Sequence, residues 1–157
     1  MIDRKEGIAS VNTINTWYET FGKKNNPALL LIMGACTQGI LWTTEFCELL
    51  SARGFFVIRY DHRDVGLSTY FNFEKEPYDL LDMAKDAVGL LDYLKISSAH
   101  LLGLSIGGPI AELISIHFSD KVLTLTLIAT SYDFRPMNRA YAGLPEEPNY
   151  PLSRTQV

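Results

Sequence analysis

The sequence is poor in the features that mark secreted and membrane proteins. It has two cysteines in 157 residues, Cys36 and Cys47, which are too few for a disulfide framework. Its longest apolar run, 28–36, is interrupted by Gly34 and falls well short of the roughly 20 residues that cross a bilayer. The charged N-terminus is not followed by an apolar segment, so no secretory signal is indicated. These absences favour a cytoplasmic protein with no membrane partner.

The sequence also lacks a cluster of positive charge. Lys and Arg number 14 against 18 Asp and Glu, for a net charge of −4, and the longest basic run is the pair 23–24. Proteins that bind nucleic acid neutralise phosphates with clustered cations, so this composition argues against a nucleic-acid partner. Hydrophobic residues make up 47% of the chain and charged residues 20%, which favours a folded core over disorder.

The order of the apolar segments predicts an α/β fold with a mostly parallel sheet and helices on both of its faces. Two β-prone runs near the N-terminus indicate an opening hairpin. Short apolar runs then alternate with segments at helical spacing, and the run 28–33 is uniformly apolar, as is typical of a buried parallel strand. This alternation implies right-handed crossovers. In the clearest helix, Asp86 falls among the polar residues between the apolar positions. Strands are expected at 28–33, 55–60, 100–104 and 122–129, and helices at 43–53, 80–94 and 106–118.

The last part of the sequence differs in character from the rest. Prolines crowd residues 135–157, where hydrophobic periodicity is lost, so this tail is expected to be a linker or the start of a cap. Residues 1–134 are expected to form the folded core that precedes this tail.

The segment 103–107 reads Gly-Leu-Ser-Ile-Gly and matches the nucleophile elbow, in which a serine sits on a sharp turn between a strand and a helix. Ser105 is therefore the candidate catalytic nucleophile. In so tight a turn, Gly103 and Gly107 have no Cβ to collide with the facing chain, and Gly108 follows as a further glycine of the elbow. The alternative is a glycine-rich turn without a catalytic role, but the strand predicted before it and the helix predicted after it favour the elbow.

A serine elbow needs backbone N–H groups to stabilise the oxyanion that forms on the substrate. The helix after the elbow offers the N–H of Ile106 and a positive dipole end. A second donor is expected in the loop after the strand 28–33, where Ala35 follows Gly34. Cys36 lies in the same loop, but no basic residue is nearby in the sequence to activate its thiol. It is interpreted as a side chain that lines the pocket rather than as a nucleophile.

Three motifs in this order resemble the α/β-hydrolase superfamily. They are Met-Gly at 33–34, Tyr-Asp-His-Arg-Asp-Val-Gly-Leu-Ser-Thr at 60–69, and the elbow. The resemblance covers residues 8–134 and is closest to the aclacinomycin methylesterase-like serine esterases. It implies a serine hydrolase that acts on a small-molecule carboxylic ester with neither a metal nor an organic cofactor, and a loop 61–68 that is structural and borders the pocket. The same superfamily hosts lyases and haloperoxidases, which fold likeness alone does not separate from esterases.

The base and the acid that a serine nucleophile needs are not evident among the three histidines. His100 begins the strand that ends at the elbow, about 16 Å from Ser105, and His117 lies about 18 Å down the following helix. His62 is at the correct sheet edge, but the strand order of the family leaves roughly 10 Å between its backbone and that of the serine. His62 is therefore a weak candidate for the base, and Asp133 is a weak candidate for the acid.

The resemblance further implies later strands and a cap that this sequence does not contain. Residues 1–134 are therefore expected to be the N-terminal part of an α/β-hydrolase core. The sequence as a whole is expected to be part of a larger hydrolase, weakly active or inactive alone. Without such strands, the strand 122–129 would be an uncovered edge, and uncovered edges pair with other chains. The alternative function is a non-catalytic α/β module that pairs with a partner, or with itself as a homodimer, through this strand.

Overall fold

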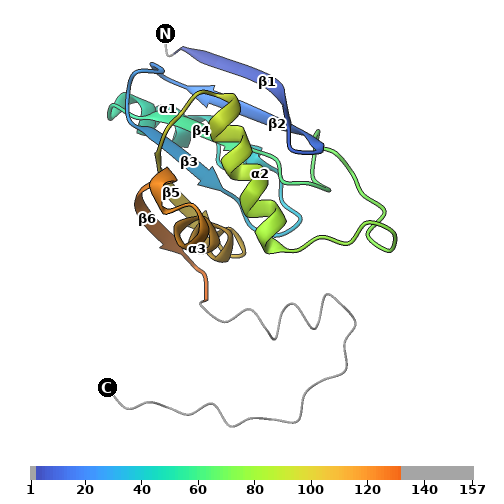
Figure 1. Cartoon of the computed structure of the whole chain (residues 1–157). Helices are drawn as coiled ribbons and strands as arrows, with labels where there is room; N and C mark the ends of the chain where they lie inside the picture. The colour runs from blue at the N-terminus through green and yellow to red at the C-terminus, as the bar shows by residue number, and fades with distance from the viewer. Residues whose placement is uncertain (1–2, 132–157) are drawn as a thin grey trace, which may run out of the picture.

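The computed structural model describes residues 3–131 of the chain (Figure 1). Within this range the chain forms a six-stranded sheet in the order β1-β2-β4-β3-β5-β6. Asp133 and the segment 135–157 lie outside the described residues, and the division of the chain at residue 134 stays a prediction. The strands are β1 (Arg4–Val11), β2 (Ile14–Phe21), β3 (Ala28–Ile32), β4 (Phe56–Tyr60), β5 (Ala99–Leu104) and β6 (Val122–Ile128); the helices are α1 (Thr44–Ala52), α2 (Leu80–Tyr93) and α3 (Gly107–His117), with the short 3-10 helices η1 (Gly39–Leu41) and η2 (Ser119–Lys121).

The sheet is antiparallel at one side and parallel over the rest. β1 and β2 form the expected hairpin, and β2 is antiparallel to β4. The strands β4, β3, β5 and β6 run parallel to one another, and α1, α2 and α3 make the crossovers that parallel pairing requires. The predicted α/β fold with a mostly parallel sheet is confirmed. Because these four strands are parallel, their carboxyl ends meet at one edge of the sheet.

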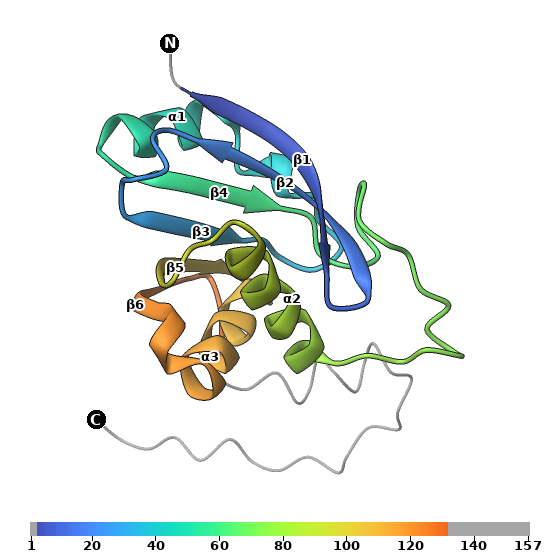
Figure 2. The same ribbon diagram turned by 45° about the horizontal axis from the view of Figure 1, so that its top comes forward.

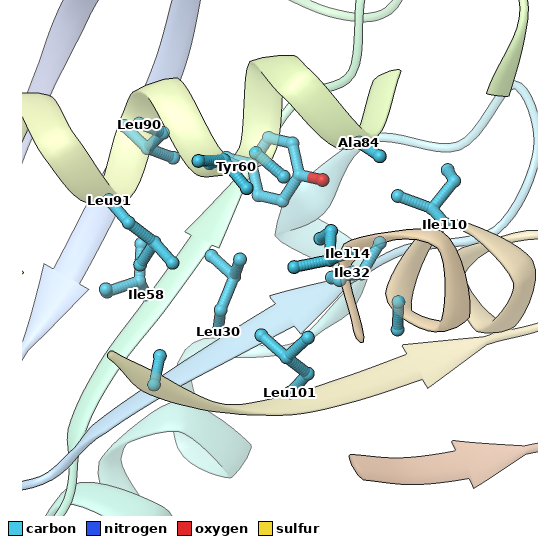
Figure 3. Close-up of a cluster of buried hydrophobic side chains, with 14 of the residues drawn as sticks. Leu30, Ile32, Ile58, Tyr60, Ala84, Leu90, Leu91, Leu101, Ile110 and Ile114 are labelled. Carbon is cyan, nitrogen blue, oxygen red and sulfur yellow. The ribbon is translucent and has the colours of Figure 1, made fainter. Parts of the chain in front are cut away.

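Helices cover both faces of the sheet, and two cores result. Figure 2 shows α2 and α3 together on one side and α1 on the other. Alternate residues of a strand point to opposite faces, so Leu30 and Ile32 of β3 lie in the core beneath α2 and α3, which Figure 3 shows in close-up. Leu29 and Leu31 lie in the second core with Cys47 of α1. Burial on both faces explains why β3 is apolar at every position.

The helix α2 buries one charged side chain that the sequence pattern placed among its polar residues. Asp86 is 3% exposed and accepts hydrogen bonds of 2.7 and 3.0 Å from Arg63. The guanidinium of Arg63 also lies over the rings of Phe71 and Tyr78. The pair ties α2 to the loop after β4, and removal of one partner from such a pair costs about 3–5 kcal/mol. The sequence pattern did not indicate the burial of Asp86, because helical periodicity does not register a partner in another element.

A second buried ion pair lies beneath the start of α1. Arg59 of β4 is 3% exposed, and its Nε donates a 2.9 Å hydrogen bond to Glu19 of β2. Its other nitrogens donate to the carbonyl oxygen of Trp42 and, at 3.2 Å, to the hydroxyl of Thr44. Arg59 therefore joins the middle of the sheet to the first turn of α1. A lone charge within an otherwise apolar strand is the sequence signal for such a pair.

The strand β6 has no strand partner on its outer side within residues 3–131. Its exposed apolar side chains are Leu123 (50%), Leu125 (38%), Leu127 (38%) and Ile128 (40%). The prediction of an uncovered edge is confirmed for the described part of the chain. Such an edge combines unpaired backbone groups with apolar surface, both of which favour association with another polypeptide.

The two cysteines give a chemical test of this fold. Cys47 is completely buried, and burial raises the pKa of its thiol to about 11, whereas Cys36 is exposed. Because the thiolate is the reactive form, we expect iodoacetamide at about pH 8, close to the ordinary thiol pKa, to alkylate Cys36 and spare Cys47. Peptide mass spectrometry reads the modified position.

The control for this experiment is the same chain in strong denaturant, where both thiols are expected to react at similar rates. Alkylation of Cys47 as fast as that of Cys36 in the folded chain would show that α1 does not cover the sheet as described.

Candidate active site

The serine of the predicted elbow lies on the turn between β5 and α3. Ser105 has a backbone φ of +54°, in the left-handed region that costs a residue with a Cβ about 1–2 kcal/mol. Two backbone hydrogen bonds hold it there, from the Ser105 N–H to the Ile128 carbonyl at 3.0 Å and from the Gly108 N–H to the Ser105 carbonyl at 2.9 Å. The side chain is partly exposed at the carboxyl edge of the sheet, where ligands bind in open α/β folds.

The glycines around Ser105 allow three close backbone approaches. A Cβ on Gly103 would lie 2.6 Å from the carbonyl carbon of Gly107, across the turn. One on Gly107 would overlap the Ile32 carbonyl oxygen at the end of β3. One on Gly108 would lie 2.7 Å from the Cβ of Thr130. Distances below about 3 Å leave no room for a methyl group, so each glycine is required by packing. The sequence predicted close approaches at Gly103 and Gly107, but it did not identify β3 as the neighbour of Gly107 or Thr130 as the neighbour of Gly108.

The loop after β3 meets the elbow at Gly34. A Cβ built on this glycine would lie 3.4 Å from the Cβ of Ser105 and 3.9 Å from its Oγ. Two segments that are far apart in the sequence, the 33–39 loop and the elbow, are therefore neighbours. Within residues 3–131, the backbone N–H groups of Ala35 and Ile106 donate no hydrogen bond, so no protein group in this range occupies either predicted donor.

The histidine at the correct sheet edge is engaged elsewhere. The Nε2 of His62 lies 3.0 Å from the carbonyl oxygen of Met33. A carbonyl only accepts, so Nε2 carries the proton in this hydrogen bond. The side chain is 3% exposed, and its burial lowers the pKa of the imidazole. His62 is therefore not placed to act as the base for Ser105. The strand order agrees, because β3 lies between β4, which precedes His62, and β5, which leads to Ser105.

The other two histidines are not at the site. Nδ1 of His100 pairs with the hydroxyl of Thr124 at 2.8 Å, at the amino end of β5, and His117 is the last residue of α3. In the part of the chain that the structure describes, the hydroxyl of Ser105 has no hydrogen-bond partner. Asp133 lies outside that part.

The role of Asp61 was not predicted in detail from the sequence. One carboxylate oxygen accepts a 2.7 Å hydrogen bond from the Gly39 N–H, and the other accepts one of 3.1 Å from the Leu67 N–H. The side chain thus joins the loop after β3 to the loop after β4. The available signal was an acidic residue directly after a largely apolar strand, a position typical of loop-organising side chains at the ligand edge of a sheet.

Two other kinds of site are not found among residues 3–131. No three side chains of His, Cys, Asp or Glu gather there as a metal-binding group. None of the helices in this range has both the length and the hydrophobicity to cross a bilayer.

A serine held in left-handed geometry between a parallel strand and a glycine-started helix defines a nucleophile-elbow α/β protein. This chain belongs to the α/β-hydrolase family, because the family model for the alpha/beta hydrolase fold matches its residues 27–148. The chain is 36% identical over 143 residues to Rhodomycin D methylesterase DauP of Streptomyces sp. (strain C5), covering 88% of this chain and 48% of that protein. It is 32% identical to 3-oxoadipate enol-lactonase 2 of Acinetobacter baylyi, over 66% of this chain and 37% of the relative.

Solved structures agree with this assignment. A hydrolase from Pseudomonas aeruginosa PA01 superposes with a TM-score of 0.77 at 28% identity, and the match covers 88% of this chain and 51% of the hydrolase. The enol-lactonase from Burkholderia xenovorans LB400 superposes with a TM-score of 0.73 at 30% identity, and the match covers 80% of this chain and 47% of that chain. The chain therefore spans about half the length of the relatives it matches.

The close approach of Gly107 to the end of β3 predicts that a larger residue at this position destabilises the fold. We expect Gly107→Ala to lower the free energy of unfolding by about 3 kcal/mol, because a backbone carbonyl rather than a flexible side chain blocks the new methyl group. Gly34→Ala is the matched control, since its Cβ would make only ordinary contact at 3.4 Å. Urea unfolding followed by circular dichroism measures both, and equal stabilities of the two variants would contradict the described elbow.

Proposed function

We propose that this chain carries the nucleophile and the oxyanion donors of a serine hydrolase that acts on carboxylic esters. The observation that carries the proposal is Ser105 at φ +54° beside the 33–39 loop. Strain of this kind persists only where the surrounding structure enforces it, and it clusters at functional sites. The esterase and lactonase activities named for the relatives support the same reaction class.

In the proposed reaction, Oγ of Ser105 attacks the carbonyl carbon of the ester. Its proton passes to a base, the carbonyl oxygen becomes an oxyanion, and the free N–H groups of Ala35 and Ile106 stabilise that charge. The amino end of α3 adds a positive dipole. Collapse of the intermediate breaks the bond to the alcohol oxygen, which takes up the proton from the base, and leaves an acyl-serine. The base then removes a proton from water as the water attacks this acyl group, and it returns the proton to the serine oxygen, so that the carboxylic acid and free Ser105 are formed. The chemistry needs neither a metal nor an organic cofactor.

The proposed substrate is a small-molecule ester, with a methyl ester as the first choice. The relatives DauP and DnrP, each 36% identical to this chain, are named as Rhodomycin D methylesterases. The proposed location is the cytoplasm, which fits two free thiols in a reducing compartment. No histidine among the described residues is placed to take the serine proton, so ester turnover by this chain alone is expected to be weak or absent.

The nucleophile is tested by covalent labelling rather than by turnover. We expect an alkyl fluorophosphonate to add one probe mass to the full chain and peptide mapping to place it on Ser105, because the free N–H groups stabilise the phosphonyl oxygen. Ser105→Ala should abolish the adduct. Ser97→Ala, at an exposed serine remote from the elbow, should not change it.

Two results would contradict the proposal. An adduct that persists in Ser105→Ala places the reactive group elsewhere, and an unlabelled wild-type chain means that the elbow does not activate its serine.

We propose as a second candidate function that the chain is a non-catalytic module that forms a homodimer through β6. The supporting observation is the bare outer edge of β6, with Leu123, Leu125 and Leu127 at 50%, 38% and 38% exposure. Two such edges related by a two-fold axis would pair antiparallel and join two sheets into one. A dimer with unlabelled Ser105 favours this module, and a labelled monomer favours the hydrolase.

A charge placed on this edge tests the dimer. Leu125→Lys should convert the dimer to a monomer in sedimentation velocity, because a buried ammonium and lost apolar contact both oppose pairing. Leu49→Lys, at a 64% exposed leucine on α1, is the control and should remain dimeric. A wild-type chain that is monomeric at the highest soluble concentration contradicts the dimer.

A further inference from the structure

The loop that carries Ala35 is held at both of its ends by neighbouring residues of a different loop. At one end, the His62 Nε2–H donates to the Met33 carbonyl at 3.0 Å. At the other end, the Asp61 carboxylate accepts from the Gly39 N–H at 2.7 Å. Both anchoring side chains are buried, with exposures of 2% for Asp61 and 3% for His62. Both hydrogen bonds are thus shielded from competition with water.

The anchored carbonyl of Met33 is confined from a second direction as well. A Cβ on Gly107 would lie 2.7 Å from the Met33 oxygen, so the first turn of α3 packs directly against it. The peptide unit between Met33 and Gly34 is planar, and its orientation therefore sets the direction in which the chain continues to Ala35. The imidazole of His62 is itself oriented by the Tyr60 ring, whose centroid lies 5.0 Å away in an edge-on arrangement.

Between the two anchors the loop has few constraints of its own. The hydroxyl of Thr37 donates to the Ala35 carbonyl at 2.7 Å, and Cys36 has a φ of +52°. Within residues 3–131, no hydrogen bond joins residues 35–37 to any other element. The direction of the Ala35 N–H therefore depends on the anchors at Met33 and Gly39.

We propose that His62 is a positioning residue, which orients the Ala35 N–H toward the oxyanion by holding the Met33 carbonyl while Asp61 holds Gly39. The inference rests on the proposed function, because it assigns the loop the role of oxyanion donor. It gives His62 a task that needs a fixed N–H rather than a titrating base. Burial keeps the imidazole neutral by lowering its pKa, and the Nε2–H tautomer supplies the donor.

The test compares three variants of the full chain with the wild type. His62→Phe fills the ring space and removes the donor, and His62→Gln restores an N–H near the same place. His100→Phe is the matched control, since His100 lies at the amino end of β5. Two quantities are measured: the backbone order parameter of Ala35 by ¹⁵N relaxation, and the rate at which a fluorophosphonate labels Ser105.

In His62→Phe we expect the order parameter of Ala35 to fall from about 0.85 to below about 0.6, while amides in α2 keep their values. We expect the labelling rate of Ser105 to fall about 100-fold, as for small displacements of a catalytic group. His62→Gln should recover most of both losses, and His100→Phe should change neither. Recovery by Gln separates positioning by the donor from simple loss of packing.

Several results overturn the proposal. They are a rigid Ala35 in His62→Phe, a mobile Ala35 with an unchanged labelling rate, and a failure of folded His62→Gln to recover. If the wild type is not labelled, the proposed hydrolase function fails, and the order parameter alone decides whether His62 anchors the loop. If His62→Phe does not fold, the tautomer of wild-type His62 decides by ¹⁵N NMR: a proton on Nε2 supports the anchor, and a proton on Nδ1 overturns it.

Discussion

The structure depends on one backbone constraint, the conversion of β5 into α3 at a residue in left-handed geometry. At so abrupt a turn, the end of β5 lies close to the first residues of α3, and the first turn of α3 lies close to the end of β3. Gly103 and Gly107 allow these two approaches, because a Cβ at either position would overlap backbone atoms. The hydrogen bonds of the Ser105 backbone to Ile128 and Gly108 offset the free-energy cost of its left-handed conformation. The outcome is a hydroxyl that projects from the sheet edge instead of packing in the core.

The order of the parallel strands determines which loops surround that hydroxyl. Since β4, β3 and β5 are adjacent and parallel, the loops that follow them lie next to one another at the carboxyl edge. Asp61 and His62 follow β4, and their hydrogen bonds reach the loop after β3, while Gly34 in that loop reaches Ser105. Three loops are thus joined in sequence, because the loop after β4 binds the loop after β3 and the loop after β3 contacts the elbow.

Much of this arrangement could be predicted from the sequence, and the exceptions share a physical cause. Short hydrophobic runs located β3 and β4, and the Gly-Leu-Ser-Ile-Gly segment located the turn, because both signals are local. The buried pair of Arg63 with Asp86 and the hydrogen bond of His62 to Met33 were missed. Each joins residues from different elements, and such a pairing is set by strand order and by which face of a helix meets the sheet. A single sequence does not contain that information locally.

The central claim is that Ser105 and the 33–39 loop together form one oxyanion-binding site. A crystal structure of the chain after reaction with a fluorophosphonate tests this most directly. The account predicts a phosphorus atom bonded to the Ser105 oxygen, with the phosphonyl oxygen about 3 Å from the backbone nitrogens of both Ala35 and Ile106. An adduct whose phosphonyl oxygen points into solvent, away from the Ala35 nitrogen, would contradict it.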